Sequence, residues 1–141
     1  MVMKKKILFL CTGNSCRSQM AEGWCRHLYP DDFEAFSAGT KKHGMNPYAI
    51  KVMKEEGVDI SSHTSKTIDQ LPAIDFDYVV TVCENAKENC PYLSGGLNFH
   101  KGFDDPPELT REMADEEDIL TVYRRVRDEI KNFISGLKDL E

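Results

Sequence analysis

Two residues in one short polar segment, Cys11 and Arg17, have the types and spacing needed to bind and attack an oxyanion. The segment CTGNSCRS (11–18) follows the apolar run ILFL (7–10). In a loop between a strand and a helix, backbone N–H groups without intrahelical partners form a nest for a tetrahedral anion. The guanidinium of Arg17 can grip two anion oxygens at once. The same positive field favours the thiolate of Cys11, so the spacing predicts a sulfur nucleophile aimed at a bound oxyanion.

The rest of this loop completes the expected cradle. Glycine and asparagine tolerate a left-handed backbone, which such a cradle needs, and Ser18 can donate a hydrogen bond to the sulfur of Cys11. The candidate oxyanion-binding residues therefore run without a break: Thr12, Gly13, Asn14, Ser15, Cys16, Arg17 and Ser18. The alternative is an ordinary strand-to-helix turn with a buried cysteine and a surface arginine.

Two further cysteines, Cys83 and Cys90, lie seven positions apart in TVCENAKENCP (81–91). A zinc site favours closely spaced cysteine and histidine ligands, and these spacings fit it poorly, so we predict no metal. The polar stretch 84–89 is expected to be weakly packed, which would allow two sulfurs to come within disulfide distance. The alternative is a buried strand residue and an incidental cysteine.

The segment GFDDPP (102–107) offers a candidate general acid. From the residues alone, either Asp104 or Asp105 could protonate a leaving oxygen. Their alternative role is to form a turn, because Asp-Pro is a common loop signal.

Alternating strands and helices must position these residues. Asn46 and Pro47 mark the start of one helix and Gly57 its end. Apolar patterns predict strands over 5–10, 33–37, 77–82 and 97–103, and helices over 18–28, 46–56 and 116–140.

This alternation predicts an α/β fold, a three-layer α/β/α arrangement with a four-stranded parallel sheet in a single domain over residues 1–141. Ligands of such sheets bind beyond the carboxyl ends of the strands. Because Cys11, Cys83 and the two aspartates each follow a predicted strand, we expect them to gather at one edge.

Composition excludes several classes of protein. The 141 residues, 40% of them hydrophobic and 30% charged, suffice for one domain with a core. The net charge of −6 argues against nucleic-acid and membrane partners, and no apolar run approaches the roughly 18 residues that cross a bilayer. The run 7–10 is too short for a secretion signal. We expect a cytoplasmic monomer, a setting in which thiols are kept reduced, so the five cysteines are expected to be catalytic, metal-binding or core residues rather than structural disulfides.

The loop CTGNSCRSQMAEGW (11–24) resembles the anion-binding loop of the low-molecular-weight protein tyrosine phosphatase fold. It is more similar still to that of the thioredoxin-coupled arsenate reductases built on this fold. The similarity runs from about residue 7 to 133 and includes SAGTKKHGMNP, DISSHTS, VVTVCENAKENCP, GFDDP and RVRDEI. The resemblance implies arsenate or a phosphate-like oxyanion as substrate, Asp105 as the acid, thioredoxin as reductant and no bound cofactor.

The resemblance implies a relay of three thiols. Cys11 attacks arsenic, Cys83 then attacks the Cys11 sulfur, and Cys90 moves the disulfide outward for thioredoxin to reduce. The first alternative is a phosphatase that hydrolyses phosphate monoesters through a Cys11 phosphoryl intermediate. The sequence PELT (107–110) after Asp105 weakens this alternative, since it offers no aromatic wall for a phenyl ring. The second is a module that only binds oxyanions or senses redox state.

Other candidate residues are given structural roles or none. Cys16 is expected to pack and Cys25 to lie in the core, and none of the four histidines is assigned a function. Some relatives hold a monovalent cation with residues matching Asn14, Glu22 and Ser37 and a further acid. Lys66 stands in place of that acid, which puts the cation site in doubt for this chain.

Overall fold

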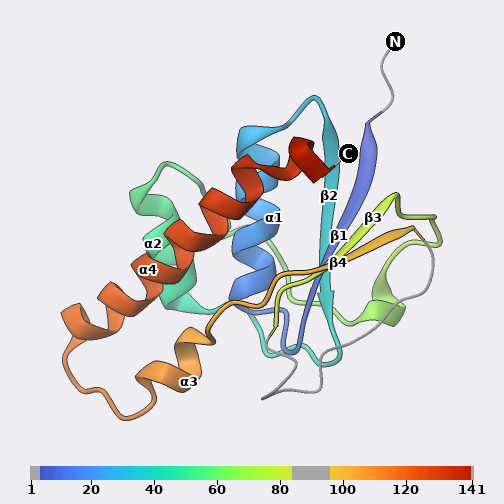
Figure 1. The fold of residues 1–141 in the computed structure, drawn as a ribbon. Helices are drawn as coiled ribbons and strands as arrows, with labels where there is room; N and C mark the ends of the chain where they lie inside the picture. The colour runs from blue at the N-terminus through green and yellow to red at the C-terminus, as the bar shows by residue number, and fades with distance from the viewer. Residues whose placement is uncertain (1–3, 84–95, 141) are drawn as a thin grey trace.

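Four parallel strands form the centre of the structure, a computed structural model that describes residues 4–83 and 96–140 (Figure 1). The sheet has the order β2-β1-β3-β4. All three neighbouring pairs are parallel, which confirms the predicted α/β class and four-stranded parallel sheet. The strands are β1 (Lys5–Cys11), β2 (Phe33–Gly39), β3 (Tyr78–Thr81) and β4 (Leu97–His100).

The register of the sheet brings three strand ends to one level. Leu10 of β1 pairs with Ala38 of β2 on one side and with Thr81 of β3 on the other. The central strand β1 is buried from Ile7 onward, as expected for a continuous apolar run covered on both faces. The residues after β1 and β3 therefore leave the sheet side by side.

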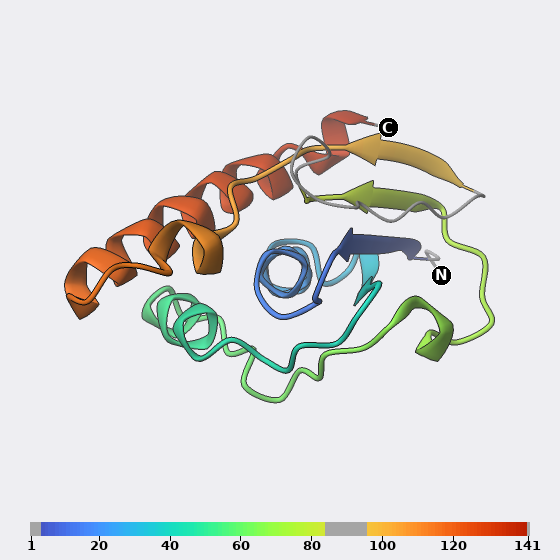
Figure 2. The ribbon, with the colours of Figure 1, turned by 90° about the horizontal axis from the view of Figure 1, so that it is seen from below.

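One face of the sheet is covered by α1 (Arg17–Leu28), with α2 (Pro47–Glu55) and α4 (Glu116–Ser135) packed beside it (Figure 2). These elements share the larger hydrophobic core. The other face carries a thinner layer that includes the 3₁₀ helix η1 (Ile68–Gln70). There Leu71 and Phe76 pack against Leu8, Leu10 and Val79.

Two helices differ from the sequence prediction. The helix predicted to reach residue 140 ends at Ser135, with Gly136 as its C-cap, and Leu137–Leu140 forms the separate 3₁₀ helix η2. Glycine is among the weakest helix formers, which explains the early end. The short helix α3 (Pro106–Thr110) was not predicted, because its two prolines indicated a loop.

The predicted cap of α2 is confirmed. Asn46 lies outside the helix, and its side-chain oxygen accepts hydrogen bonds from the backbone N–H groups of Tyr48 and Ala49 at 2.9 and 3.2 Å. Gly57 follows with a positive φ of 78°. These contacts fix where α2 begins and ends.

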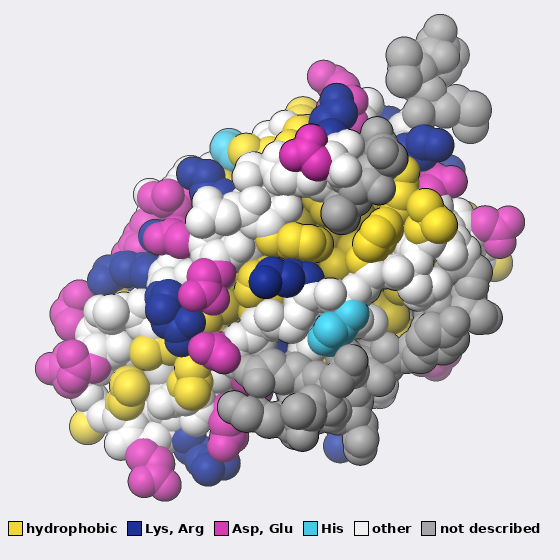
Figure 3. Space-filling view, in the orientation of Figure 1, with side chains coloured by type: hydrophobic (Ala, Val, Ile, Leu, Met, Phe, Trp, Pro, Cys, Tyr) yellow, Lys and Arg dark blue, Asp and Glu magenta, His cyan; other side chains and the backbone are white. Residues whose placement is uncertain are grey.

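Charged side chains join α4 to α2, with Arg124 half-buried and Arg127 buried. Arg124 donates two hydrogen bonds to Glu55, at 3.0 and 2.8 Å, and Arg127 donates a third at 3.0 Å. Acidic and basic side chains are interspersed over this part of the surface (Figure 3). Within the described residues, no helix is both long and apolar enough to cross a membrane.

Candidate active site

The loop between β1 and α1 forms a pocket of about 230 Å³ at the carboxyl edge of the sheet. The loop, the segment after β2 and the start of α3 all contribute to its wall. The residues that line it are Cys11, Thr12, Gly13, Ser15, Cys16, Arg17, His43, Asp105 and Pro107. The structure thus brings together most of the loop residues selected from the sequence.

Asn14 shapes the loop from behind. It is fully buried and has a φ of 49°, the left-handed conformation expected of an asparagine in a cradle. Its Oδ1 accepts hydrogen bonds from the backbone N–H of Lys66 at 2.8 Å and from Nε2 of Gln19 at 2.9 Å. Its Nδ2 donates to Oγ of Ser18 at 2.8 Å. These bonds hold the strained residue in place and turn its side chain, with that of Ser18, toward the interior.

Gly13 has a different role from the one predicted. Its φ is not positive, so the loop does not need glycine there for a left-handed backbone. A Cβ at this position would instead lie 2.4 Å from Nδ1 of His43. Glycine leaves room for the imidazole of His43, which packs directly on the loop and would have to move if a Cβ were added.

His43 was missed in the sequence analysis, although it lies in one of the segments that carry the resemblance. Its backbone N–H donates to the Gly13 carbonyl, and that of Lys41 donates to the Thr12 carbonyl, each at 3.0 Å. These bonds tie the segment after β2 to the outside of the loop. Nothing in the sequence spacing between Gly13 and His43 could have indicated that the two residues are in contact.

A buried polar network continues behind Asn14. Nδ1 of His63 lies 3.0 Å from Oε1 of Gln19, which can only accept, so Nδ1 carries the proton of the neutral ring. Burial lowers the pKa of His63, partly opposed by the negative charge of Glu22. Gln19 in turn donates to Asn14, so the network supports the loop from the inner side.

Two of the residues that the resemblance linked to a cation site, Glu22 and Ser37, are hydrogen-bonded to each other. Oγ of Ser37 donates to Oε1 of Glu22 at 2.6 Å, and the other oxygen of Glu22 lies 3.0 Å from Arg26. The ammonium of Lys66 donates to the Thr64 carbonyl at 3.0 Å. Glu22 is therefore already balanced by a cation of the chain itself.

Arg17 faces the candidate acid. It is 3% exposed, and its Nη1 donates to the carbonyl of Phe103 at 3.2 Å. Its Nη2 lies 3.6 Å from Oδ1 of Asp105. The loop after β4 thus orients the guanidinium toward the pocket.

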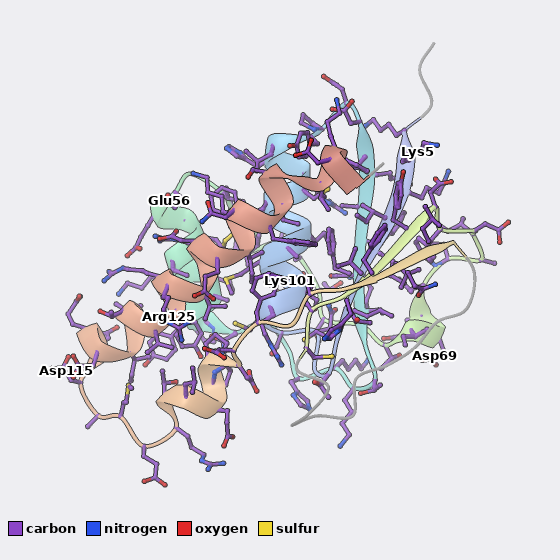
Figure 4. All side chains as sticks on the ribbon, in the orientation of Figure 1. Lys5, Glu56, Asp69, Lys101, Asp115 and Arg125 are labelled. Carbon is purple, nitrogen blue, oxygen red and sulfur yellow. The ribbon has the colours of Figure 1, made fainter. Side chains whose placement is uncertain are left out.

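The two adjacent aspartates point in different directions. Asp105 lines the pocket with Cys11, and although it is the N-cap residue of α3 its side chain makes no capping hydrogen bond. Asp104 accepts a hydrogen bond at 3.0 Å from Arg125, which is labelled on α4 in Figure 4. Of the pair, the structure places Asp105 beside the cysteine.

Among the described residues, Cys11, Cys16 and Cys25 are free thiols. Cys11 is buried at the end of β1 and lines the pocket. Burial raises the pKa of Cys16, as does the adjacent Cys11. Burial also raises the pKa of Cys25 to about 12, and this residue belongs to the core as predicted. Cys16 and Cys25 therefore remain protonated near neutral pH.

Cys83 leaves the sheet beside Cys11. It follows β3 by two residues, and the backbone N–H of Val82 donates to the carbonyl of Leu10 at 2.9 Å. Cys83 is fully buried and disulfide-bonded. Cys90 lies outside the described residues.

The parallel sheet, the Cys-x5-Arg loop and the facing aspartate define an α/β protein with a pocket suited to a tetrahedral oxyanion. The sequence pattern of the family described as low molecular weight phosphotyrosine protein phosphatase matches residues 6–139, and the chain belongs to this family. It is 54% identical over 128 residues to an arsenate reductase of Halalkalibacterium halodurans, covering 90% of each chain.

Solved structures show the same likeness. One, described as an arsenate reductase in the oxidized state, superposes with a TM-score of 0.77 at 32% identity. Another, an arsenate reductase in the phosphate binding state, has a TM-score of 0.74 at the same identity. Both matches cover 94% of this chain and 95% of the other.

Proposed function

We propose that this protein reduces arsenate to arsenite through Cys11, Cys83 and Cys90, and that thioredoxin recycles it. The observation that carries the proposal is the position of Cys83. It adds a further buried cysteine beside the pocket, which Cys11 and Cys16 already line together with Arg17 and Asp105. Hydrolysis of a phosphate ester needs the pocket but has no use for the sulfur of Cys83. The arsenate reductases similar to this chain support the same choice of substrate.

The first step forms a bond between sulfur and arsenic. Arsenate is a tetrahedral oxyanion that the loop N–H groups and Arg17 hold. The Cys11 thiolate attacks the arsenic, and a hydroxide departs. Asp105 gives this hydroxide a proton, so that water leaves. The side chain of Asp105 is 34% exposed, which lets it regain a proton from solvent.

The second step transfers two electrons to arsenic. The Cys83 thiolate attacks the Cys11 sulfur and forms a disulfide, while the electron pair of the sulfur–arsenic bond stays with arsenic and arsenite leaves. Cys90 then attacks Cys83, which releases Cys11 as a thiolate. The resulting Cys83–Cys90 disulfide is the one that thioredoxin reduces. The disulfide bond of Cys83 in the structure supports a redox role for this residue.

Phosphate ester hydrolysis is the second candidate, and the description of the matched family favours it. In that reaction Cys11 forms a phosphoryl intermediate, and Asp105 acts first as acid and then as base. Among the described residues that line the pocket there is no Phe, Tyr or Trp to stack on a phenyl ring. This composition disfavours phosphotyrosine as the main substrate.

A coupled assay separates the two candidates. The protein is supplied with arsenate, thioredoxin, thioredoxin reductase and NADPH, and NADPH loss is followed for wild type, Cys83→Ser and Cys90→Ser. Sustained turnover is expected only for wild type and for Cys25→Ala, which removes a core thiol outside the relay. Cys90→Ser should stop after about one turnover, because the Cys11–Cys83 disulfide then stays next to the pocket and is not moved outward for thioredoxin to reduce. Rapid aryl phosphate hydrolysis that ignores the Cys83 and Cys90 substitutions, without NADPH loss, would contradict the proposal.

A further inference from the structure

Asn46 bonds to three separate parts of the structure. Its backbone N–H donates to the carbonyl of Ser15, in the anion-binding loop, at 3.1 Å. Its side-chain oxygen caps α2, and its Nδ2 donates to the phenol oxygen of Tyr123, on α4, at 3.0 Å. One residue therefore ties the loop to two helices.

Tyr123 lies on α4, the helix against which α3 packs. It is 2% exposed, and its ring centroid lies 5.2 Å from that of Tyr48. Burial raises the pKa of Tyr123 to about 12, while hydrogen bonding with Asn46 and Thr110 acts in the opposite direction. The phenol is therefore neutral, and it lies beside the cap of α2, on the helix against which α3 packs.

Thr110, the last residue of α3, bonds to the first residue of that helix, next to the acid. Its hydroxyl donates to the carbonyl of Pro106 at 2.8 Å, and Pro106 directly follows Asp105. The backbone N–H of Leu109 donates to the Asp105 carbonyl at 3.0 Å. Helix α3, for which Asp105 is the N-cap residue, has only five residues, so its position depends on its packing against α4.

Two walls of the pocket are thus joined from behind. Ser15 belongs to one wall and Asp105 to the other. Hydrogen bonds join Ser15 to Asn46 and Asn46 to Tyr123, and the helix that carries Tyr123 packs against α3. We propose that Asn46 and Tyr123 are positioning residues that hold α3, and with it Asp105, at a fixed separation from the anion-binding loop. The inference rests on the proposed function, in which Asp105 must reach an oxygen of the bound anion.

The pair acts through Asp105, so its effect must depend on that residue. An acid transfers its proton only within hydrogen-bond reach, and a displacement of about 1 Å can cost as much as 100-fold in rate. Removal of the Asn46–Tyr123 hydrogen bond loosens α3 without removing the acid. We therefore expect a loss of about three- to tenfold in the rate of the chemical step.

The test uses Tyr123→Phe and Asn46→Ser. Serine keeps the backbone N–H and remains a good helix N-cap, so only the donor to Tyr123 is lost. The control is Tyr29→Phe. It removes a phenol that donates to the carbonyl of Ser135, the last residue of α4. Arsenite formed in a single turnover is measured, together with the dissociation constant for inorganic phosphate and the thermal midpoint.

Each variant should slow arsenite formation by about three- to tenfold, and the double variant should be no slower than either one. Phosphate affinity should stay within about twofold, and the control should match wild type. In an Asp105→Asn background, Tyr123→Phe should cause no further loss. Unchanged rates, or the same loss in the Asp105→Asn background, would overturn the positioning role.

The outcome also separates this inference from the proposed function. A wild-type protein that forms no arsenite contradicts the proposed function alone. The rate of aryl phosphate hydrolysis is then measured for the same variants, because that reaction also requires Asp105 as the acid. Active wild type with unaffected Asn46 and Tyr123 variants contradicts the inference alone.

Discussion

The guanidinium Nη2 of Arg17 lies 3.6 Å from Oδ1 of Asp105, and both residues line the same pocket as Cys11. Arg17 is buried, whereas Asp105 keeps a third of its side chain in contact with solvent. The cation that would hold an oxyanion thus also orients the acid that would act on it. Binding and proton transfer should nevertheless respond separately to substitution, because each group can be altered alone.

Asp105→Asn should slow the first chemical step by about 100-fold or more, because the amide cannot supply the proton. Phosphate binding should be retained or become tighter, since a negative charge is removed beside the anion. Rapid-quench measurement of arsenite checks the rate, and calorimetry checks the binding. Asp104→Asn is the matched control and should stay within about twofold, because Asp104 pairs with Arg125 on the surface. Equal losses in both variants would contradict the assignment of the acid.

Arg17→Lys should weaken phosphate binding by about 10- to 100-fold. Lysine keeps the charge but loses the fork that binds the anion and the Phe103 carbonyl together. Titration calorimetry at constant ionic strength measures the change. The control is Arg125→Lys, an exposed arginine of α4 whose substitution should leave the affinity unaltered. Full affinity in Arg17→Lys would show that the loop N–H groups alone bind the anion.

Gly13→Ala should disrupt the loop, and His43→Ala should restore it. All three atoms nearest to an added Cβ belong to the His43 ring, the closest at 2.4 Å. The double variant should therefore recover most of the phosphate affinity that Gly13→Ala loses. Normal phosphate binding by Gly13→Ala alone would contradict the inference that His43 excludes a side chain at position 13.

Glu55→Gln should destabilise the fold by about 1 kcal/mol at pH 7. Hydrogen bonds from Arg124, and then from Arg127, lower the pKa of Glu55 below its ordinary value of 4.5. A lowered pKa means that this stabilisation is present above pH 4.5 and is lost as the pH falls through the folded-state value. Urea unfolding at pH 7 and at pH 3 should therefore show a larger difference between Glu55→Gln and wild type at pH 7 than at pH 3. Glu34→Gln, an exposed position on β2, should show little difference at either pH.

Local patterns in the sequence predicted the strands, the cap at Asn46 and the loop around Cys11. These features depend on residues close together in the chain, which is why spacing and residue type were sufficient. The bond between Asn46 and Tyr123 spans 77 positions, and no spacing rule indicates it. The same limit applies to His43 on Gly13, where a glycine selected for its backbone freedom instead leaves space for a packed imidazole.

Local patterns also failed where two signals competed. The prolines of α3 indicated a turn, yet proline is well suited to the first turn of a helix. For the long C-terminal helix, the apolar stripe continued past Gly136, but the helix did not. Spacing alone did not separate Asp105 from Asp104; the resemblance implied Asp105, and the structure has that residue in the wall of the pocket.

Disulfide mapping after one turnover tests the relay most directly. The protein is fully reduced, freed of reductant and mixed with excess arsenate, and then arsenite and disulfide-linked peptides are quantified. We expect one arsenite per chain, a Cys83–Cys90 disulfide and a free Cys11 in wild type, and a Cys11–Cys83 disulfide in Cys90→Ser. Arsenite formed by Cys83→Ser at the wild-type rate, or no bond between Cys11 and Cys83 in Cys90→Ser, would contradict the mechanism.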